Sequence, residues 1–232
     1  MTIRVEPLAG LDLRLEPGDW AFATAERSRI AAHWRTRLAA NPHLWNSDAL
    51  ICTAAEVTGQ VLAARFAITD YASFVAWRDW GWPDRNARNC FGVPVAVSAD
   101  GALLFGIMGE RTLNPGKCYP PSGSLERRDV LADGRIDIEG SMRIELAEET
   151  GLDANEAKAG PMLAIFDGQR LAVARSLEFP HSFATLAQRF TAHAAADAHP
   201  ELAAVEAIRS RSQIDSRMPG YAQEIVRIFL GP

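Results

Sequence analysis

Three glutamates in one short segment have the residue type and spacing to act together. Glu145, Glu148 and Glu149 stand in the run SMRIELAEETGL, which begins at Ser141. In an α-helix, with about 100° between successive residues, their carboxylates share an arc of about 100°. Carboxylates three and four residues apart repel by roughly 0.2–0.5 kcal/mol per pair, and acids near a helix C-terminus oppose its dipole. The cluster therefore predicts hard divalent cations, Mg²⁺ or Mn²⁺, which take oxygen ligands and bridge to phosphate.

The residues that follow predict where this helix ends. Gly151 is suited to the left-handed position that terminates a helix, and Leu152 to the apolar contact that accompanies it. A solvated acidic face is the alternative interpretation, but a solvated last turn more often carries Lys or Arg. We expect Met142 and Leu146 to point into the core.

Residues 145–152, ELAEETGL, match the second half of the Nudix box, G-x5-E-x7-R-E-U-x-E-E-x-G-U. Upstream, PPSGSLE resembles the Pro-Gly loop before the Nudix helix, and VPVAVSADGALLFGIM resembles the hairpin that opens the domain. Residues 89–232 are therefore similar to Nudix hydrolases. The resemblance implies an α/β/α sandwich with a mixed sheet, and hydrolysis of the diphosphate bond of a nucleoside diphosphate derivative by a metal-activated water.

Two departures from the box concern the loop before the helix. Ile144 stands where the box has arginine, and Arg143 falls one position early. Gly123 and Glu145 lie 22 residues apart, seven more than in the box pattern, and the extra residues coincide with an Asp-Gly turn at residues 133–134. No acid is in register with the first box glutamate, which leaves three candidates: Glu126, Asp137 and Glu139.

An enlarged loop and an absent arginine resemble the UDP-glucose pyrophosphatase branch of the superfamily. Residues 34–46, WRTRLAANPHLWN, are similar to the N-terminal helix and Asn-Pro turn of that branch. This resemblance implies hydrolysis of UDP-glucose or UDP-galactose to UMP and a sugar 1-phosphate. The alternatives are an ADP-ribose or dinucleotide pyrophosphatase, and a catalytically weak Nudix-like regulator that binds nucleotide.

The resemblance also implies roles for individual residues. Glu145, Glu148 and Glu149 would hold one to three Mg²⁺ or Mn²⁺ ions, and Glu145 or Glu149 would act as the general base. Loop residues and one further acid are candidates for substrate binding: Arg111, Lys117, Tyr119, Gly123, Glu126 and Glu201.

The surrounding pattern predicts the elements that position this helix. We expect a helix over 23–41 that ends at Asn41-Pro42, strands over 50–54 and 60–69, and helical spacing from Tyr71. The polar stretch 84–90 then separates a small α+β segment, 1–85, from a Nudix-like domain, 86–232.

In the second part, Asp-Gly turns at 100–101 and 167–168 predict hairpins, and the turn at 133–134 predicts a weaker one. Helices are expected over 139–150, 182–195 and 221–230, and a strand over 203–208.

Composition excludes several classes of protein. The 232 residues are 48% hydrophobic and 23% charged, which is typical of a folded chain, and the net charge of -5 argues against broad binding to nucleic acid or anionic membranes. No apolar run approaches the roughly 18–20 residues that span a bilayer, and no secretory signal is evident. We expect a cytoplasmic protein whose partner is a small-molecule substrate, with a homodimer left open.

Overall fold

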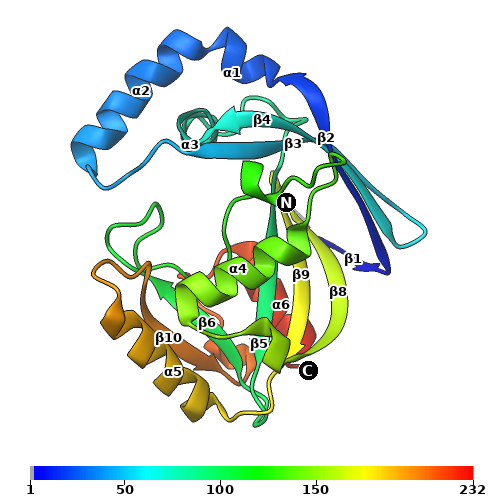
Figure 1. Cartoon of the computed structure of the whole chain (residues 1–232), viewed down its shortest axis with the longest axis vertical. Coiled ribbons are helices and arrows are strands. Elements are labelled where there is room, and N and C mark those ends of the chain that lie inside the picture. The colour runs from blue at the N-terminus through cyan, green and yellow to red at the C-terminus, as the bar shows by residue number, and fades with distance from the viewer. Residues whose placement is uncertain (1–2, 232) are drawn as a thin grey trace.

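The computed structural model describes residues 3–231, which form two sheets with helices around them (Figure 1). The large sheet has the strand order β1-β8-β9-β5-β6-β10, with β7 paired to β6, and the small sheet has the order β2-β4-β3. The strands are β1 (Arg4–Leu8), β2 (Gly10–Asp19), β3 (Asp48–Thr58), β4 (Val61–Asp70), β5 (Asn89–Val97), β6 (Leu103–Met108), β7 (Cys118–Tyr119), β8 (Lys158–Asp167), β9 (Arg170–Glu178) and β10 (Leu202–Ile208). The helices are α1 (Ala21–Ala25), α2 (Arg27–Ala40), α3 (Tyr71–Asp79), α4 (Ile138–Thr150), α5 (Phe183–Ala196) and α6 (Gly220–Phe229), with 3₁₀ turns η1 (Arg127–Asp129), η2 (Ala154–Glu156) and η3 (Arg211–Gln213).

The large sheet is mixed and is covered on both faces. Strands β5 and β9 run parallel, whereas β5–β6, β8–β9, β6–β10 and β1–β8 are antiparallel. Helices α4 and α5 lie on one face and α6 lies on the other (Figure 1). Strand β5 is apolar along nearly its whole length because both of its faces are buried. The predicted α/β/α sandwich with a mixed sheet is confirmed.

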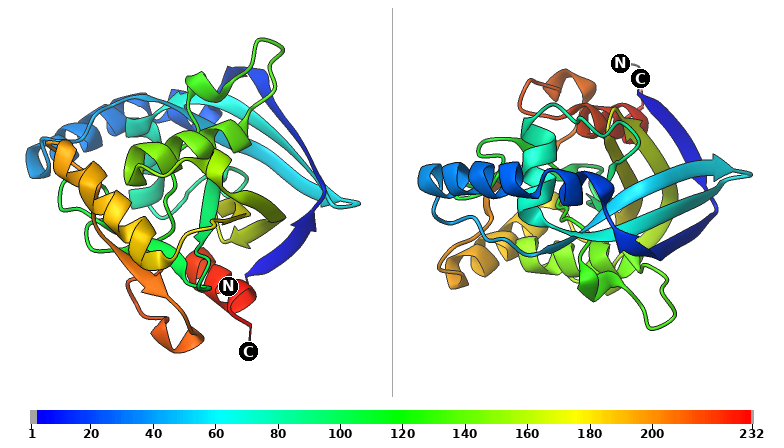
Figure 2. Two further views of the ribbon diagram at one scale, coloured as in Figure 1. Left: turned by 60° about the horizontal axis from the view of Figure 1, so that its bottom comes forward. Right: turned by 90° about the horizontal axis from the view of Figure 1, so that it is seen from above.

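The small sheet and helices α1 to α3 lie together at one end of the molecule (Figure 1). Trp20, Phe74 and Trp77 form part of the core between these helices and the sheet. The hairpin that joins β3 to β4 projects from the side of the molecule in both further views (Figure 2). Strand β1 does not belong to this sheet, since it pairs with β8 at the edge of the large one.

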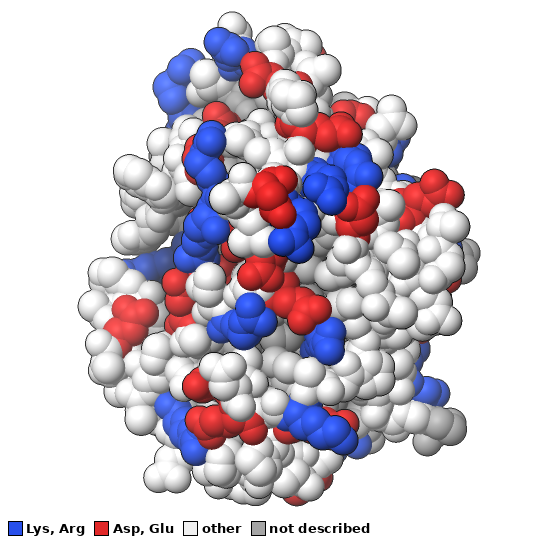
Figure 3. All heavy atoms as spheres, turned by 45° about the vertical axis from the view of Figure 1, so that its right-hand side comes forward, with Lys and Arg blue, Asp and Glu red and all other residues white. Residues whose placement is uncertain are grey.

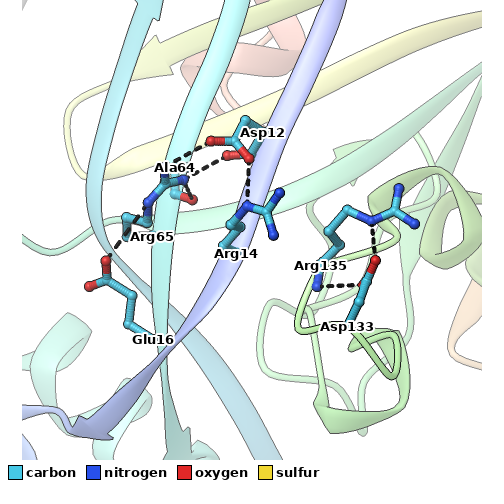
Figure 4. A network of polar contacts seen from close by, with 7 residues as sticks. All are labelled: Asp12, Arg14, Glu16, Ala64, Arg65, Asp133 and Arg135. Carbon is cyan, nitrogen blue, oxygen red and sulfur yellow. Dashed lines mark hydrogen bonds and ion pairs between the residues drawn. The ribbon is translucent and has the colours of Figure 1, made fainter.

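The enlarged loop before α4 is hydrogen-bonded to strand β2 of the small sheet. The backbone N–H of Leu15 donates to the carbonyl of Gly134 over 2.9 Å, and that of Ile136 donates to Leu13 over 3.0 Å. Arg14 and Arg135 are therefore neighbours across a short antiparallel bridge (Figure 4). Each guanidinium is neutralised by an aspartate of its own segment, Asp12 at 2.9 Å and Asp133 at 2.7 Å. The extra residues of the loop thus extend the contact between the two parts of the chain.

Most of the expected elements are present close to the expected bounds. The first helix is divided at Glu26 into α1 and α2, and it ends before Asn41 as predicted. The turns at 100–101 and 167–168 join paired strands, whereas the turn at 133–134 closes only a single bridge between Val130 and Ile136. The division of the chain at residues 85 and 86 stays a prediction. Within residues 3–231, no helix combines the length and the apolar character that crossing a membrane requires.

Candidate functional site

Helix α4 is fixed at both ends by its own sequence. The Asp137 side chain caps the N-terminus by accepting a hydrogen bond from the Gly140 N–H over 2.8 Å. At the other end Gly151 adopts φ 71°, the left-handed conformation predicted for it, and Leu152 is fully buried. The Nε2 atom of His193, on α5, lies 2.8 Å from the Glu148 carbonyl, one of the last carbonyls of the helix. These contacts fix the rotation of the helix and therefore the directions of its glutamates.

The three glutamates of α4 differ in burial. Glu145 is 8% exposed and Glu149 is 7% exposed, whereas the Glu148 side chain is 57% exposed. Burial raises the pKa of Glu145 to about 7, although Arg128 acts in the opposite direction. Burial, followed by the charges of Glu201 and Glu145, raises the pKa of Glu149 well above its usual value. The Oε2 atom of Glu149 has no hydrogen-bond partner among residues 3–231.

An arginine from the enlarged loop contacts these carboxylates. Nη2 of Arg128 lies 2.9 Å from Oε1 of Glu145, and Nη1 lies 3.2 Å from Oε1 of Glu148. Nε of the same guanidinium is 3.6 Å from Glu126, two residues earlier in the loop. The loop thus supplies a positive charge to the carboxylates of the helix.

The donor set has the chemistry that a hard divalent cation requires. It consists of carboxylate oxygens, and one of them, Oε2 of Glu149, is buried with no partner in the described part of the chain. As the side chains stand, no group of three or more His, Cys, Asp or Glu residues within 3–231 is arranged to hold a metal ion. The guanidinium of Arg128 lies among the carboxylates instead.

Gly123 is required by the approach of the loop to the helix. A Cβ atom at this position would lie 2.2 Å from the carboxyl carbon of Glu145, well inside van der Waals contact. Glu145 is buried among its neighbours, so its carboxylate would have to shift to make room for any side chain at position 123. The glycine therefore lets the loop backbone pass directly against a glutamate of the cluster.

Glu145 and Glu148 open into a cleft of about 730 Å³ between the small sheet with its helices and the large sheet, whereas Glu149 is not among the residues that line it. A volume of this order is typical of small-molecule sites. Basic and aromatic side chains line it beside the acids, among them Arg78, Arg111, Lys117, Arg170, Trp45, Tyr71, Phe74, Trp82, Phe91, Tyr119 and Tyr221. On the face of the molecule drawn in Figure 3, basic and acidic side chains are interspersed.

The structure brings all six predicted substrate-binding residues to this cleft, together with Glu145 and Glu148. Several of them already have protein partners. Arg111 contacts His199, Nζ of Lys117 donates to the Ser216 carbonyl over 3.3 Å, and the Tyr119 hydroxyl accepts from Asn114 over 3.3 Å. Partial burial raises the pKa of Glu201, and its charge in turn raises that of Glu149.

The structure places the three candidates for the first box glutamate in different surroundings. Asp137 caps α4, and Glu139 is paired with Arg175 over 3.1 Å. Glu126 alone of the three pairs with Arg128 and lines the cleft. Of the three candidates, only Glu126, the one closest to Gly123 in sequence, therefore lies with the α4 glutamates at the cleft.

Sequence reasoning missed the wall of the cleft that comes from the first 85 residues. Trp45, Tyr71, Phe74, Arg78 and Trp82 all line it, and although Trp45 falls within the segment that resembles the UDP-sugar branch, none of the five was predicted to contact substrate. Arg128 was also missed, because a loop arginine reaches the helix glutamates only through the folded path of the loop. Its position two residues after Glu126 is the one local signal that could have pointed to it.

No protein-family model matches the chain, and no curated protein matches it. Among solved structures it is similar to DR0079 from Deinococcus radiodurans, with 15% identity and a TM-score of 0.42 over 62% of this chain and 84% of that one. It is also similar to a Nudix hydrolase from M. smegmatis, RenU, with 14% identity and a TM-score of 0.39 over 60% of this chain and 81% of that one. A MutT protein from Methanosarcina mazei Go1 shows 17% identity and a TM-score of 0.39 over 61% of this chain and 92% of its own.

Proposed function

We propose that this chain is a metal-dependent Nudix hydrolase that cleaves the diphosphate bond of a nucleoside diphosphate derivative. The observation that carries the proposal is the position of the α4 glutamates, within the box-like run, beside a cleft that also presents arginines and aromatic rings. Carboxylates suit divalent cations, arginines suit phosphate oxygens, and aromatic rings suit a nucleobase. One cleft thus offers a group for each part of such a substrate.

In this proposal Glu145, Glu148 and Glu149 hold Mg²⁺ or Mn²⁺. Such an ion, when bound, supplies positive charge against the diphosphate and lowers the pKa of a coordinated water. Glu145 is the first choice of general base, because a carboxylate of the cluster that holds the ion would lie within reach of the coordinated water. Glu149 is the second choice. Arg111 and Lys117, at the cleft wall, are proposed to bind the phosphates, and Tyr119 is proposed to contact the base.

Within this class we propose UDP-glucose and UDP-galactose as substrates, with UMP and a sugar 1-phosphate as products. The support is the sequence resemblance of the enlarged loop and of residues 34–46 to the UDP-sugar branch. ADP-ribose and dinucleotides are the alternative substrates. A regulator that binds nucleotide without hydrolysing it is the alternative function, favoured by the guanidinium that already neutralises the carboxylates.

A substrate panel with two variants tests the proposal. Release of UMP or AMP would be measured from UDP-glucose, UDP-galactose, ADP-ribose and dinucleoside polyphosphates with Mg²⁺ or Mn²⁺. Glu149→Ala is expected to reduce turnover at least about 100-fold, a loss typical of removing a catalytic or ligand carboxylate. Glu224→Gln is the matched control, since Glu224 pairs with Arg227 on α6 and does not line the cleft.

Each result has a distinct meaning. Metal-dependent turnover that Glu149→Ala loses and Glu224→Gln retains would support the hydrolase, and the preferred nucleotide would choose between the substrate classes. Saturable nucleotide binding with no product from any member of the panel would instead support the regulator.

A further inference from the structure

Arg128 occupies the position among the carboxylates where positive charge is needed. Its guanidinium contacts Glu145, Glu148 and Glu126 at 2.9, 3.2 and 3.6 Å. Of these partners Glu145 is the most buried, with a side chain 11% exposed. A buried carboxylate is costly unless it is paired or hydrogen-bonded. The arginine therefore holds together a cluster whose members would otherwise repel one another.

We propose that Arg128 is a positioning residue that stands in for the divalent cation in the carboxylate cluster, and that cation binding displaces it. The inference rests on the proposed function, because it concerns the same glutamates. The Oε1 atoms of Glu145 and Glu148 accept hydrogen bonds from Arg128, so lone pairs that a cation would need are already engaged. A cation bound to the same carboxylate oxygens would also be repelled by the guanidinium, because both are positively charged. The two are therefore alternative occupants.

The surroundings allow the side chain to leave while the loop stays in place. The backbone beside Arg128 is anchored to β3, because the Leu50 N–H donates to the Leu125 carbonyl over 2.8 Å. Arg127, the preceding residue, pairs with Asp48 over 3.0 Å. The Arg128 side chain itself is 41% exposed. It can thus turn away from the carboxylates without unfolding the loop.

The test measures Mn²⁺ binding in the absence of any nucleotide. The dissociation constant would be obtained by electron paramagnetic resonance for the wild type, Arg128→Met and Arg127→Met. Methionine removes the charge at either position and adds no oxygen ligand. Both variants change the net charge equally and lie side by side in the loop, but only Arg128 contacts Glu145 and Glu148.

Arg128→Met is expected to bind Mn²⁺ about tenfold more tightly than the wild type, whereas Arg127→Met stays within about twofold. Arg128→Lys keeps the charge and is expected to remain close to the wild type, which would attribute a gain in Arg128→Met to the loss of the charge. A merely structural role for Arg128 would weaken binding on its removal. The proposal is overturned if Arg128→Met binds Mn²⁺ no better than the wild type, if Arg127→Met gains equally, or if no variant binds Mn²⁺.

The outcome can be separated from that of the proposed function. Tighter Mn²⁺ binding by Arg128→Met, in a protein that hydrolyses nothing in the substrate panel, would uphold the role of Arg128 and reject the hydrolase. Mn²⁺-dependent hydrolysis together with unchanged affinity in Arg128→Met would uphold the hydrolase and reject the role of Arg128.

Discussion

At the scale of single residues, the buried carboxyl of Glu149 is expected to lower the free energy of unfolding of the metal-free protein. Its pKa is raised in the folded state, mainly by burial, so the unfolded chain, with a glutamate pKa of about 4.3, ionises more readily. The free energy of unfolding therefore falls as the pH rises from the unfolded value through the folded one. In EDTA at pH 8 we expect Glu149→Gln to be more stable than the wild type by roughly 1–3 kcal/mol, as measured by urea unfolding.

The same comparison at pH 5 supplies an internal check. A larger fraction of the buried carboxyl is protonated in the folded protein at pH 5 than at pH 8, so the advantage of Glu149→Gln should shrink. Glu148→Gln is the matched variant, because its side chain is largely exposed. A Glu149→Gln protein with the same pH dependence as the wild type would contradict the burial of an unpaired carboxylate.

The sequence predicted that three glutamates would share one face of a helix but not how buried or how charged each one is. Their spacing on a helix follows from the 3.6-residue repeat, so a common face could be predicted. Whether a given carboxylate is buried depends on what packs over the helix. Gly123 and Arg128 come from a loop whose path is set by contacts with β2 and β3, residues more than 70 positions away in sequence. No local pattern carries that information.

At the scale of elements, the end of α4 is expected to be more sensitive than other glycine turns. Gly151 has φ 71°, and a Cβ atom there would lie 2.7 Å from Cβ of His193. Gly134 has φ 79°, but a Cβ atom there would meet nothing within 4 Å. Alanine at Gly134 should cost about 1–2 kcal/mol through backbone strain alone. Alanine at Gly151 should cost more, because α5 must also shift.

Urea unfolding of the two alanine variants measures the difference directly. The Gly151→Ala protein should also lose diphosphate hydrolysis out of proportion to its loss of stability, since the helix end orients Glu148 and Glu149. Equal destabilisation by the two substitutions would show that His193 does not restrain this end of the helix.

Many of the elements after residue 20 were predictable from local signals, whereas strands β1 and β2 were not expected. The first long helix ends before Asn41-Pro42, Asp-Gly pairs form the turns of hairpins, and Gly151 terminates α4. The pairing of elements was not predictable in the same way. Strand β1 joins the large sheet rather than the neighbouring small one, and that choice depends on a free edge offered by β8.

At the scale of the whole molecule, the cleft requires both parts of the chain. Trp45 lies in the segment between α2 and β3, lines the cleft, and is 79% exposed. Stacking of a nucleobase on an aromatic ring contributes about 1–3 kcal/mol. We therefore expect Trp45→Ala to weaken nucleotide binding about tenfold or more while the thermal midpoint stays unchanged, as measured by calorimetric titration and thermal unfolding.

Leu131→Ala is the matched control for this prediction. Leu131 is also an exposed apolar residue, 41% exposed, but it does not line the cleft. Both variants should therefore unfold at the wild-type temperature. Nucleotide affinity equal in the two variants would show that this wall of the cleft does not contact the base.

The pairing of β1 with β8 bears on the order in which the protein is made and folds. Arg4 is the partner of Phe166, so this contact closes a span of 162 residues. Ribosomal synthesis exposes β1 long before β8, and contacts of such high sequence separation form slowly. Until the edge of β8 emerges, β1 has no partner in its final sheet. The small sheet has all of its strands within the first 70 residues and can form early, whereas β1 can close onto the large sheet only after β8 has been made.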